Sequence, residues 1–363
     1  MIILFSLFAA RAFAGPTPEI RGVWADREPL ATRESIRGML DALKAARFNA
    51  VFVNVWSRGY PLWRSATFEQ HTGLLTDPVY GDRDVLAEVI EEARSRGIAV
   101  IPWVEYGFVI GYSGGRSPLA EVHPGWLAQR RDGSTDFPWA GSTRSYWIAH
   151  TNPEGQQFLL DLMRELALGY DVPAIQFDRA RYPELDCGYD PATKALYAAE
   201  HGGSAPPANE KDPAWMRWRA DKLNAFVATL GKRLKAANWR GLVTSAPIVF
   251  NYSYVNFLQE FPAWMKAGAL DFVSPQVYRS DVQGFAAELN RQLAALDGDG
   301  TRLVPGLDIT NTSVDTLIRS IEICREKSLA GIVIWYYGGL VRKGALDRLA
   351  ETVFAEPAPL PWK

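Results

Sequence analysis

Four acidic residues each follow directly on an apolar run: Asp26, Glu105, Asp178 and Asp308. The run before Asp178, Val172–Phe177, has the short and nearly continuous apolar character of a strand that is covered on both faces. In α/β proteins the carboxyl ends of parallel strands meet at one edge, where ligands bind. Two carboxyl groups, one protonated and one ionised, are the groups that cleave glycosidic bonds. We therefore predict that Asp178 and Glu105 form a catalytic pair, with Asp308 as the reserve candidate.

Arg179 and Arg181 follow Asp178 closely, and they leave a second interpretation of this carboxylate open. A carboxylate beside arginines can serve only to organise a loop through a salt bridge. If Asp178 is catalytic, Arg181 becomes a candidate substrate-binding residue beside it. The sequence does not assign the acid and the nucleophile within the pair.

Aromatic and amide side chains stand at the same predicted strand ends. Aromatic rings stack on the apolar C–H faces of sugars, and amides and carboxylates bond to sugar hydroxyl groups. For each tryptophan the alternative is that it simply closes the hydrophobic core. The candidate substrate-binding residues of this kind are Trp24, Asp26, Asn54, Trp103, Gln276, Tyr278 and Trp335.

The sequence contains few of the motifs that bind metals or cofactors. None of the 4 histidines belongs to a His-x-His pair at a strand end, so we predict no transition-metal site. Loop carboxylates leave a structural calcium ion open. Gly-x-Ser-x-Gly, P-loop and dinucleotide fingerprints are all missing, which argues against the common acyl-transfer, nucleotide-binding and redox chemistries. We therefore predict no cofactor.

Strand-like and helix-like segments alternate eight times along the chain, which predicts an α/β fold with a parallel sheet. Eight such pairs in one unbroken domain indicate a (β/α)8 TIM barrel. The excess length lies in three long loops after strands 2, 3 and 4, namely Ser57–Tyr80, Tyr106–Thr151 and Arg179–Lys211, which would build a cleft. The predicted strands are Arg21–Asp26, Asn49–Trp56, Ile98–Glu105, Val172–Asp178, Gly241–Pro247, Leu270–Tyr278, Arg302–Asp308 and Gly331–Tyr337.

The composition bounds the class of protein. A chain of 363 residues that is 48% hydrophobic can bury a large core. The formal net charge of -2 argues against a nucleic-acid partner. No feature of the sequence predicts an oligomeric state.

The ends of the chain have their own signals. Met1–Ala14 is an apolar run that closes with small residues, as a signal peptide does, and we expect a periplasmic or secreted protein. The run is too short to span a bilayer, so no stable membrane insertion is expected. Residues 15–355 would form the barrel and Glu356–Lys363 a C-terminal tail. Cys187 falls in a predicted loop and Cys324 in a predicted helix, so we expect free or packed thiols rather than a disulfide.

Several motifs occur in order along nearly the whole chain: Glu19–Trp24, Val100–Phe108, His123–Leu127, Ile175–Asp178, Arg181–Pro183, Gly188–Asp190, Trp218–Lys222 and Ser274–Arg279. On these motifs the chain resembles the glycosyl-hydrolase-family-10-like (DUF187) proteins. The resemblance implies an exported, glycosidase-like TIM barrel, and some relatives act on bacterial cell-wall glycan strands. It also implies that Glu105 and Asp178 occupy the family's acidic strand-end positions, with Arg21, Gln276 and Tyr278 in its cleft.

The chain departs from that family pattern beside the predicted catalytic aspartate. Pro173-Ala174 replaces an Asp-Gly pair, and Arg179 stands where Asp is frequent. Our leading hypothesis is an exported glycoside hydrolase acting on a polysaccharide or oligosaccharide. The departures keep open a non-catalytic glycan-binding protein on a degenerate barrel, and a transglycosylase is a third hypothesis.

Overall fold

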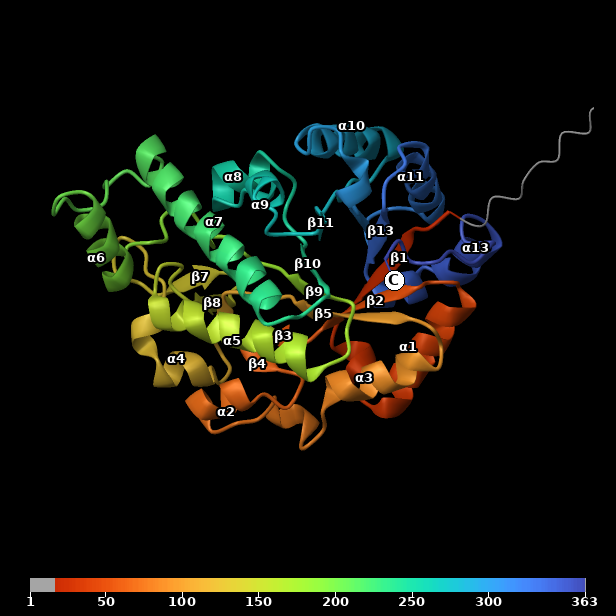
Figure 1. The fold of residues 1–363 in the computed structure, drawn as a ribbon, viewed down its shortest axis with the longest axis horizontal. Coiled ribbons are helices and arrows are strands. Elements are labelled where there is room, and N and C mark those ends of the chain that lie inside the picture. The colour runs from red at the N-terminus through yellow and green to blue at the C-terminus, as the bar shows by residue number, and fades with distance from the viewer. Residues whose placement is uncertain (1–16, 363) are drawn as a thin grey trace, which may run out of the picture.

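The computed structural model describes residues 17–362, so the predicted signal peptide lies outside the described residues. Eight parallel strands form one sheet in the order β11-β10-β9-β5-β2-β1-β13-β12. Its two edges meet through parallel bridges from Val273 to Leu303 and from Gln276 to Gly306, which close the sheet. Helices surround the strands (Figure 1), and the predicted (β/α)8 barrel is confirmed. The strands are β1 (Ile20–Ala25), β2 (Ala50–Asn54), β5 (Ala99–Val104), β9 (Ala174–Phe177), β10 (Leu242–Ser245), β11 (Phe272–Val273), β12 (Gly306–Asp308) and β13 (Gly331–Trp335).

Several barrel strands are shorter in the structure than predicted, and β11 (Phe272–Val273) and β12 (Gly306–Asp308) are the shortest of them. β11 and β12 cover only the middle of one predicted segment and the end of the other. Pro275 interrupts the first segment and Pro305 the second. Proline has no N–H to donate to a neighbouring strand, so regular pairing stops there. The closure of the barrel at this seam therefore depends on isolated bridges.

The helices that cover the barrel begin at the predicted capping residues where these were identified. Asn152 accepts a hydrogen bond from the Gly155 N–H, and Asp212 accepts one from the Trp215 N–H. The outer helices are α1 (Arg33–Ala45), α3 (Val85–Arg94), α5 (Pro153–Gly169), α7 (Pro213–Ala236), α8 (Tyr252–Phe257), α9 (Phe261–Lys266), α10 (Val282–Ala294), α11 (Val314–Glu326), α12 (Tyr337–Arg342) and α13 (Ala345–Glu351).

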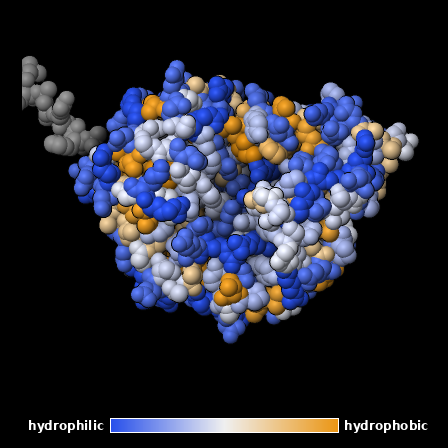
Figure 2. Space-filling model, turned by 180° about the vertical axis from the view of Figure 1, so that it is seen from behind, coloured by the Kyte–Doolittle hydropathy of each residue, from blue (hydrophilic) through white to orange (hydrophobic). Residues whose placement is uncertain are grey.

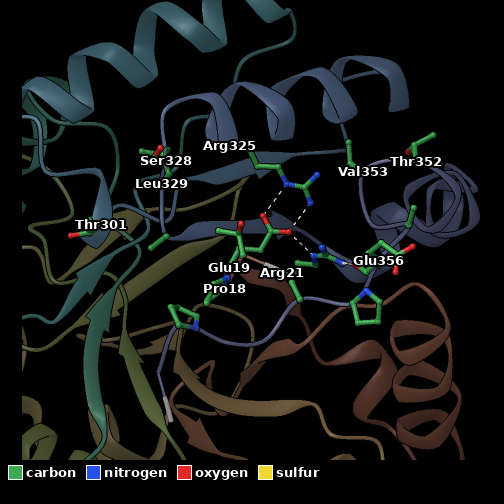
Figure 3. A pocket seen from close by; sticks show the side chains of 16 residues that line it. Pro18, Glu19, Arg21, Thr301, Arg325, Ser328, Leu329, Thr352, Val353 and Glu356 are labelled. Atoms are coloured by element: carbon green, nitrogen blue, oxygen red, sulfur yellow. Dashed lines mark hydrogen bonds and ion pairs between the residues drawn. The ribbon is translucent and has the colours of Figure 1, made fainter. Parts of the chain in front are cut away.

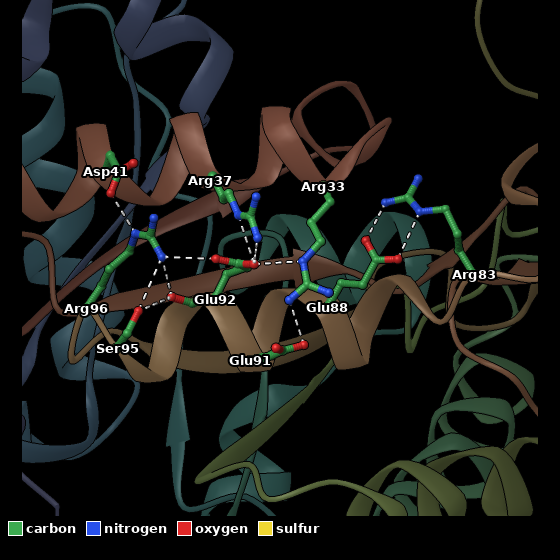
Figure 4. A network of polar contacts seen from close by, with 9 residues as sticks. All are labelled: Arg33, Arg37, Asp41, Arg83, Glu88, Glu91, Glu92, Ser95 and Arg96. Carbon is green, nitrogen blue, oxygen red and sulfur yellow. Dashed lines mark hydrogen bonds and ion pairs between the residues drawn. The ribbon is translucent and has the colours of Figure 1, made fainter.

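A polar network joins α1 to α3 on the outside of the barrel (Figure 4). The Glu92 carboxylate accepts from Arg33 Nε at 2.7 Å and pairs with Arg37 at 2.9 Å and with Arg96 at 3.3 Å. Each arginine extends along the surface and leaves part of its side chain in water. The network therefore fixes the relative position of two neighbouring helices far from the strand ends.

The three long loops after β2, β5 and β9 carry secondary structure of their own. They follow the predicted strands in the expected places, on the side of the barrel where the strands end. The larger elements in them are β3 (Trp56–Ser57), β4 (Tyr60–Pro61), α2 (Ala66–Thr72), β6 (Val109–Tyr112), α4 (Pro118–Val122), β7 (Asp136–Pro138), β8 (Arg144–Trp147) and α6 (Pro191–Glu200).

Arg219 of α7 anchors the long loop that follows β9. Its side chain is fully buried. The guanidinium donates to the carbonyl oxygens of Leu185, Cys187 and Glu210. One side chain therefore holds three points of the loop.

Replacing this arginine should therefore destabilise the protein. We expect Arg219→Met to lower the free energy of unfolding by about 2–4 kcal/mol, because buried carbonyl groups lose charged donors. Urea denaturation would measure the change. Arg233→Met on the same helix, where the arginine bonds to Gln157 at an exposed site, should cost less than about 1 kcal/mol. Equal losses in the two variants would contradict the anchoring role.

The C-terminal segment packs across the amino-terminal end of the barrel. The Pro359 carbonyl accepts from the Glu19 N–H at 3.0 Å, and the Trp362 ring stacks on Phe272 at 5.6 Å. Cys187 and Cys324 are both buried free thiols, as predicted. In residues 17–362 no helix has the length and apolar character needed to cross a membrane.

Candidate active site

A cavity of about 180 Å³ lies at the carboxyl ends of the strands. The space-filling view shows a hollow near the middle of one face, with hydrophilic residues lining it (Figure 2). Most of the predicted site residues meet in the cavity, although they come from five separate segments of the sequence. Its walls are formed by Trp24, Trp103, Glu105, Asp178, Arg179, Gln276, Tyr278 and Trp335.

Glu105 stands directly after β5 and is 7% exposed. Asn54, the last residue of β2, donates from Nδ2 to one of its carboxylate oxygens. Arg179 Nη1 donates to the other at 3.1 Å. Burial raises the pKa of Glu105 to about 7, since the loss of water outweighs the attraction of Arg179. This carboxyl group can therefore hold a proton near neutral pH.

Asp178 stands directly after β9 and is 4% exposed. Its Oδ2 accepts from Trp103 Nε1 at 3.3 Å, and its Oδ1 accepts from the Arg179 N–H at 2.5 Å. Burial raises the pKa of Asp178, and the charges of Arg179 and Arg181 act against that rise. The two predicted catalytic residues thus share one cavity and share Arg179 as a partner, but their other partners differ.

Arg179 connects the two carboxyl groups. Its backbone is left-handed, with φ of 45°, which is unusual for a residue with a side chain. This conformation points its N–H at Asp178 while its guanidinium bonds to the Glu105 side chain and, at 2.7 Å, to the Glu105 carbonyl. Gly107 packs against the same turn, where a Cβ at position 107 would lie 2.1 Å from the backbone carbonyl oxygen of Asp178. The alternative of a salt bridge from Asp178 to Arg179 or Arg181 is not what forms in residues 17–362, because Arg179 makes its ion pair with Glu105.

Three tryptophans pack against one another at the floor and wall of the cavity. The ring centroids of Trp24 and Trp103 are 6.0 Å apart, and Trp335 lies 5.8 Å from Trp103. Trp24 donates from Nε1 to Gln176 at 2.7 Å, which holds its ring in place. Trp24 and Trp103 are buried and close the core, whereas Trp335 is half-buried. Both interpretations of these residues therefore apply, and Trp335 is the ring best placed to stack on a ligand.

Gln276 and Tyr278 form the opposite wall. Gln276 Nε2 donates to the Ala246 carbonyl at 3.0 Å, so its amide has a fixed direction. Burial and the nearby carboxylates raise the pKa of Tyr278, which keeps its hydroxyl protonated. Each side chain can therefore donate a hydrogen bond to a sugar hydroxyl or accept one from it.

Asp308 and Asp26 lie at the same end of the barrel but outside the cavity wall. Asp308 Oδ1 accepts from the Thr310 N–H at 2.7 Å and Oδ2 accepts from Asn311 Nδ2 at 2.6 Å, so its own loop uses both oxygens. Burial and Glu28 raise the pKa of Asp26. The structure does not bring Asp308 to the catalytic pair, because its carboxylate caps the turn that follows β12.

Arg21 and Arg181 do not line the cavity either. Arg21 is the second residue of β1, and it lies at the amino-terminal end of the barrel, where Glu19 accepts from its Nε at 2.7 Å (Figure 3). The expectation that Arg21 contributes to the cleft is wrong, since a residue at the start of a strand faces the other end of the barrel. Arg181 packs over the Phe257 ring at 5.1 Å and acts on Asp178 through its charge.

Residues 19–301 match the family model described as glycosyl hydrolase-like 10. The chain belongs to the glycosyl hydrolase-like 10 family. This match confirms the resemblance found in the sequence, and it covers the strands that carry Asn54, Glu105, Asp178 and Gln276.

Two curated relatives have low sequence identity to this chain. Glycosyl hydrolase YngK of Bacillus subtilis is 25% identical over 71% of the chain, and glycosyl hydrolase DigH of Escherichia coli K12 is 26% identical over 66%. The chain spans about half the length of these curated relatives, 52% of the first and 56% of the second.

Solved structures of glycoside hydrolases share the fold. The PgaB (BpsB) glycoside hydrolase domain of Bordetella bronchiseptica superimposes with a TM-score of 0.69 at 15% identity, over 92% of this chain and 98% of that one. The catalytic domain of a β-amylase from Paenibacillus polymyxa has a TM-score of 0.70 at 11% identity, over 95% and 100%. The family and its structural neighbours together establish a glycoside-hydrolase-like barrel.

Sequence reasoning missed Arg179, Tyr106 and Trp139 as site residues. The Arg179 guanidinium lies 4.9 Å from the Tyr106 ring centroid and 4.7 Å from that of Trp139. A signal was present for two of them, because Tyr106 and Arg179 each follow a strand-end carboxylate directly. Trp139 comes from the middle of a long loop and had none. Within residues 17–362 no three or more His, Cys, Asp and Glu side chains gather in a way that could hold a metal ion.

Proposed function

We propose that this protein is an exported glycoside hydrolase that cleaves O-glycosidic bonds of a polysaccharide, with Glu105 as general acid and Asp178 as the ionised partner. Support comes from the family and from the carboxyl pair in one small, aromatic-lined cavity. Export rests on the composition of Met1–Ala14. Bacterial cell-wall glycan is the first substrate to test.

The unequal surroundings of the two carboxyl groups carry this assignment. Glu105 has a pKa of about 7, which suits a group that must donate a proton to the leaving oxygen. Burial raises the pKa of Asp178 as well, but the charges of Arg179 and Arg181 and the hydrogen bonds from Trp103 and the Arg179 backbone act against that rise. On these contacts we assign the ionised role to Asp178. Asp178 would then attack the anomeric carbon or activate a water molecule there.

Asn54 suits the proton donor because its amide can serve both states of Glu105. Its Nδ2 donates to the ionised carboxylate. Its Oδ1 is buried and has no partner among residues 17–362. If the amide turned over, this oxygen would accept a hydrogen bond from the protonated carboxyl group.

A second candidate function is glycan binding without turnover. The observation that favours it is the ion pair between Arg179 and Glu105, since a fixed positive charge holds a carboxylate ionised and unable to donate a proton. Arg179 also stands where acidic residues are frequent in the resembled family.

The release of reducing ends from a panel of polysaccharides, including peptide-free cell-wall glycan, tests the proposal. We expect release that is fastest below pH 7 and declines as Glu105 loses its proton above it. Saturable binding with no release on any glycan would favour the binding protein instead. Product analysis by mass spectrometry would separate hydrolysis from transglycosylation.

The pH profile should also respond to Arg179. Its charge lowers the pKa of Glu105, so Arg179→Gln should raise that pKa and move the alkaline limb of kcat/KM to higher pH. Arg179→Lys keeps the charge and should leave the limb near its original position. An unchanged limb in Arg179→Gln would show that Glu105 does not control the alkaline side of the profile.

A further inference from the structure

We propose that the cavity between the loops after β1, β2 and β5 is a substrate subsite for a sugar residue that carries a carboxylate. This cavity has a volume of about 750 Å³ and lies beside the active-site cavity. The inference rests on the proposed function, because it names a chemical property of the same substrate. It concerns Arg27, Arg58 and Arg116, which the catalytic mechanism does not use.

The subsite adjoins the active site across an aromatic wall. Tyr106 and Trp139 line it and stack on each other, with ring centroids 5.7 Å apart. The Arg179 guanidinium, which lines the active-site cavity, packs over both rings. A glycan whose scissile bond lies between Glu105 and Asp178 would therefore extend its next sugars over these rings, which offer stacking surfaces.

A third cavity continues the cleft on the other side. It has a volume of about 580 Å³ and shares Gln276 and Tyr278 with the active site. In the closed sheet, β2 and β11 are separated by three strands in either direction, so the two flanking cavities stand on opposite sides of the barrel mouth. Sugar units can thus lie on both sides of the cleavage point.

The charge of the subsite indicates what kind of sugar it receives. Its lining carries three guanidinium groups and a single carboxylate, that of Asp77. Arg27 pairs with Asp77 at 2.6 Å, and Arg116 pairs with Glu121 at 3.2 Å. Arg58 is exposed and, within residues 17–362, takes part in no ion pair of 4.0 Å or less.

Arg58 is held at the subsite by its backbone. It has a left-handed conformation, with φ of 58°, at the turn between β3 and β4. The following Gly59 packs so closely on the Ile110 carbonyl that a Cβ would lie 2.1 Å from it. Arg58 lines the same cavity as Tyr106 and Trp139, so it lies on the side of the aromatic wall that faces the subsite. A planar guanidinium in this position can bind a carboxylate through two parallel hydrogen bonds.

Equilibrium binding to charged and neutral forms of one glycan tests the inference. The probes are peptide-free cell-wall glycan strands and oligogalacturonate, each before and after chemical reduction of its carboxyl groups to alcohols. Titration calorimetry with the Asp178→Asn protein avoids turnover of the probe. We expect at least one carboxylated probe to bind about tenfold more tightly than its reduced form, with a difference that shrinks as salt is added.

Adding Arg58→Gln should remove most of that difference and leave the affinity for the reduced probe unchanged. Arg58→Lys should retain part of it. Arg94→Gln is the matched control, because Arg94 is 72% exposed on α3 and away from the cleft. Equal affinity for the charged and reduced forms, no binding of either, or an equal effect of Arg94→Gln would overturn the inference. If the unmodified protein binds in a charge-dependent way but hydrolyses no glycan, the proposed activity is contradicted and the subsite is supported. If it hydrolyses a glycan but binds the charged and reduced forms equally, the subsite is contradicted and the proposed activity is supported.

Discussion

Asp178→Asn is expected to lower kcat on the cleaved glycan by about 10²–10⁴-fold while leaving affinity for the glycan within a few-fold of the original. The substitution keeps the shape of the side chain and removes the ionised oxygen that would act at the anomeric carbon. Trp103 Nε1 and the Arg179 N–H bond to different oxygens of Asp178, so the amide oxygen keeps one of these two donors, which is enough to hold the side chain in place. The loss should therefore appear in the chemical step and not in folding.

Initial rates of reducing-end release, together with calorimetric binding of the same glycan, would measure both quantities. Asp308→Asn is the matched control, since Asp308 also stands at the end of a barrel strand but both of its carboxylate oxygens accept hydrogen bonds from its own loop. We expect Asp308→Asn to lower the melting temperature and to change kcat by less than about tenfold. If Asp178→Asn changes kcat little and Asp308→Asn lowers it strongly, Asp308 and not Asp178 is the catalytic residue.

Glu105→Gln is expected to have an effect of similar size on kcat/KM, about 10²–10⁴-fold, and to abolish the decline of activity above pH 7. The same substitution should stabilise the protein in alkaline solution. The pKa of Glu105 is about 7 in the folded state against 4.5 for the free side chain. The folded-state pKa is thus raised, so this group's contribution to stability is full below pH 4.5 and is lost as the pH rises to 7.

The stability lost by the unmodified protein over that pH range amounts to about 3 kcal/mol. Glutamine stays neutral, so the stability of the variant does not fall in this pH range. Part of this advantage is offset because Arg179 loses its charged partner in the variant. Chemical denaturation at pH 4.5 and pH 8 would measure the difference between the two proteins. A variant that is less stable than the unmodified protein at pH 8 would contradict the burial of an uncharged Glu105.

Local pattern was sufficient to predict the barrel and the positions of Glu105 and Asp178 at its mouth. Apolar runs alternate with amphipathic segments, and parallel strands joined by helices place all their carboxyl ends on one side. A charged residue that ends such a run is therefore brought to the mouth by topology alone. The same reasoning located Asn54, Gln276 and Trp335, because each stands at or near the end of a strand.

Which side chains at that mouth belong to the site was decided only by the tertiary structure. Arg21 shares a motif with Trp24 but starts its strand, so the two lie at opposite ends of the barrel. Asp308 ends a strand as Asp178 does, yet the turn after it satisfies its oxygens. Arg179 became a partner of Glu105 through a left-handed backbone and two aromatic rings from the preceding loop. Strand position depends on the local pattern, whereas the direction and partners of a side chain depend on loops that are distant in sequence, and only folding brings these loops together.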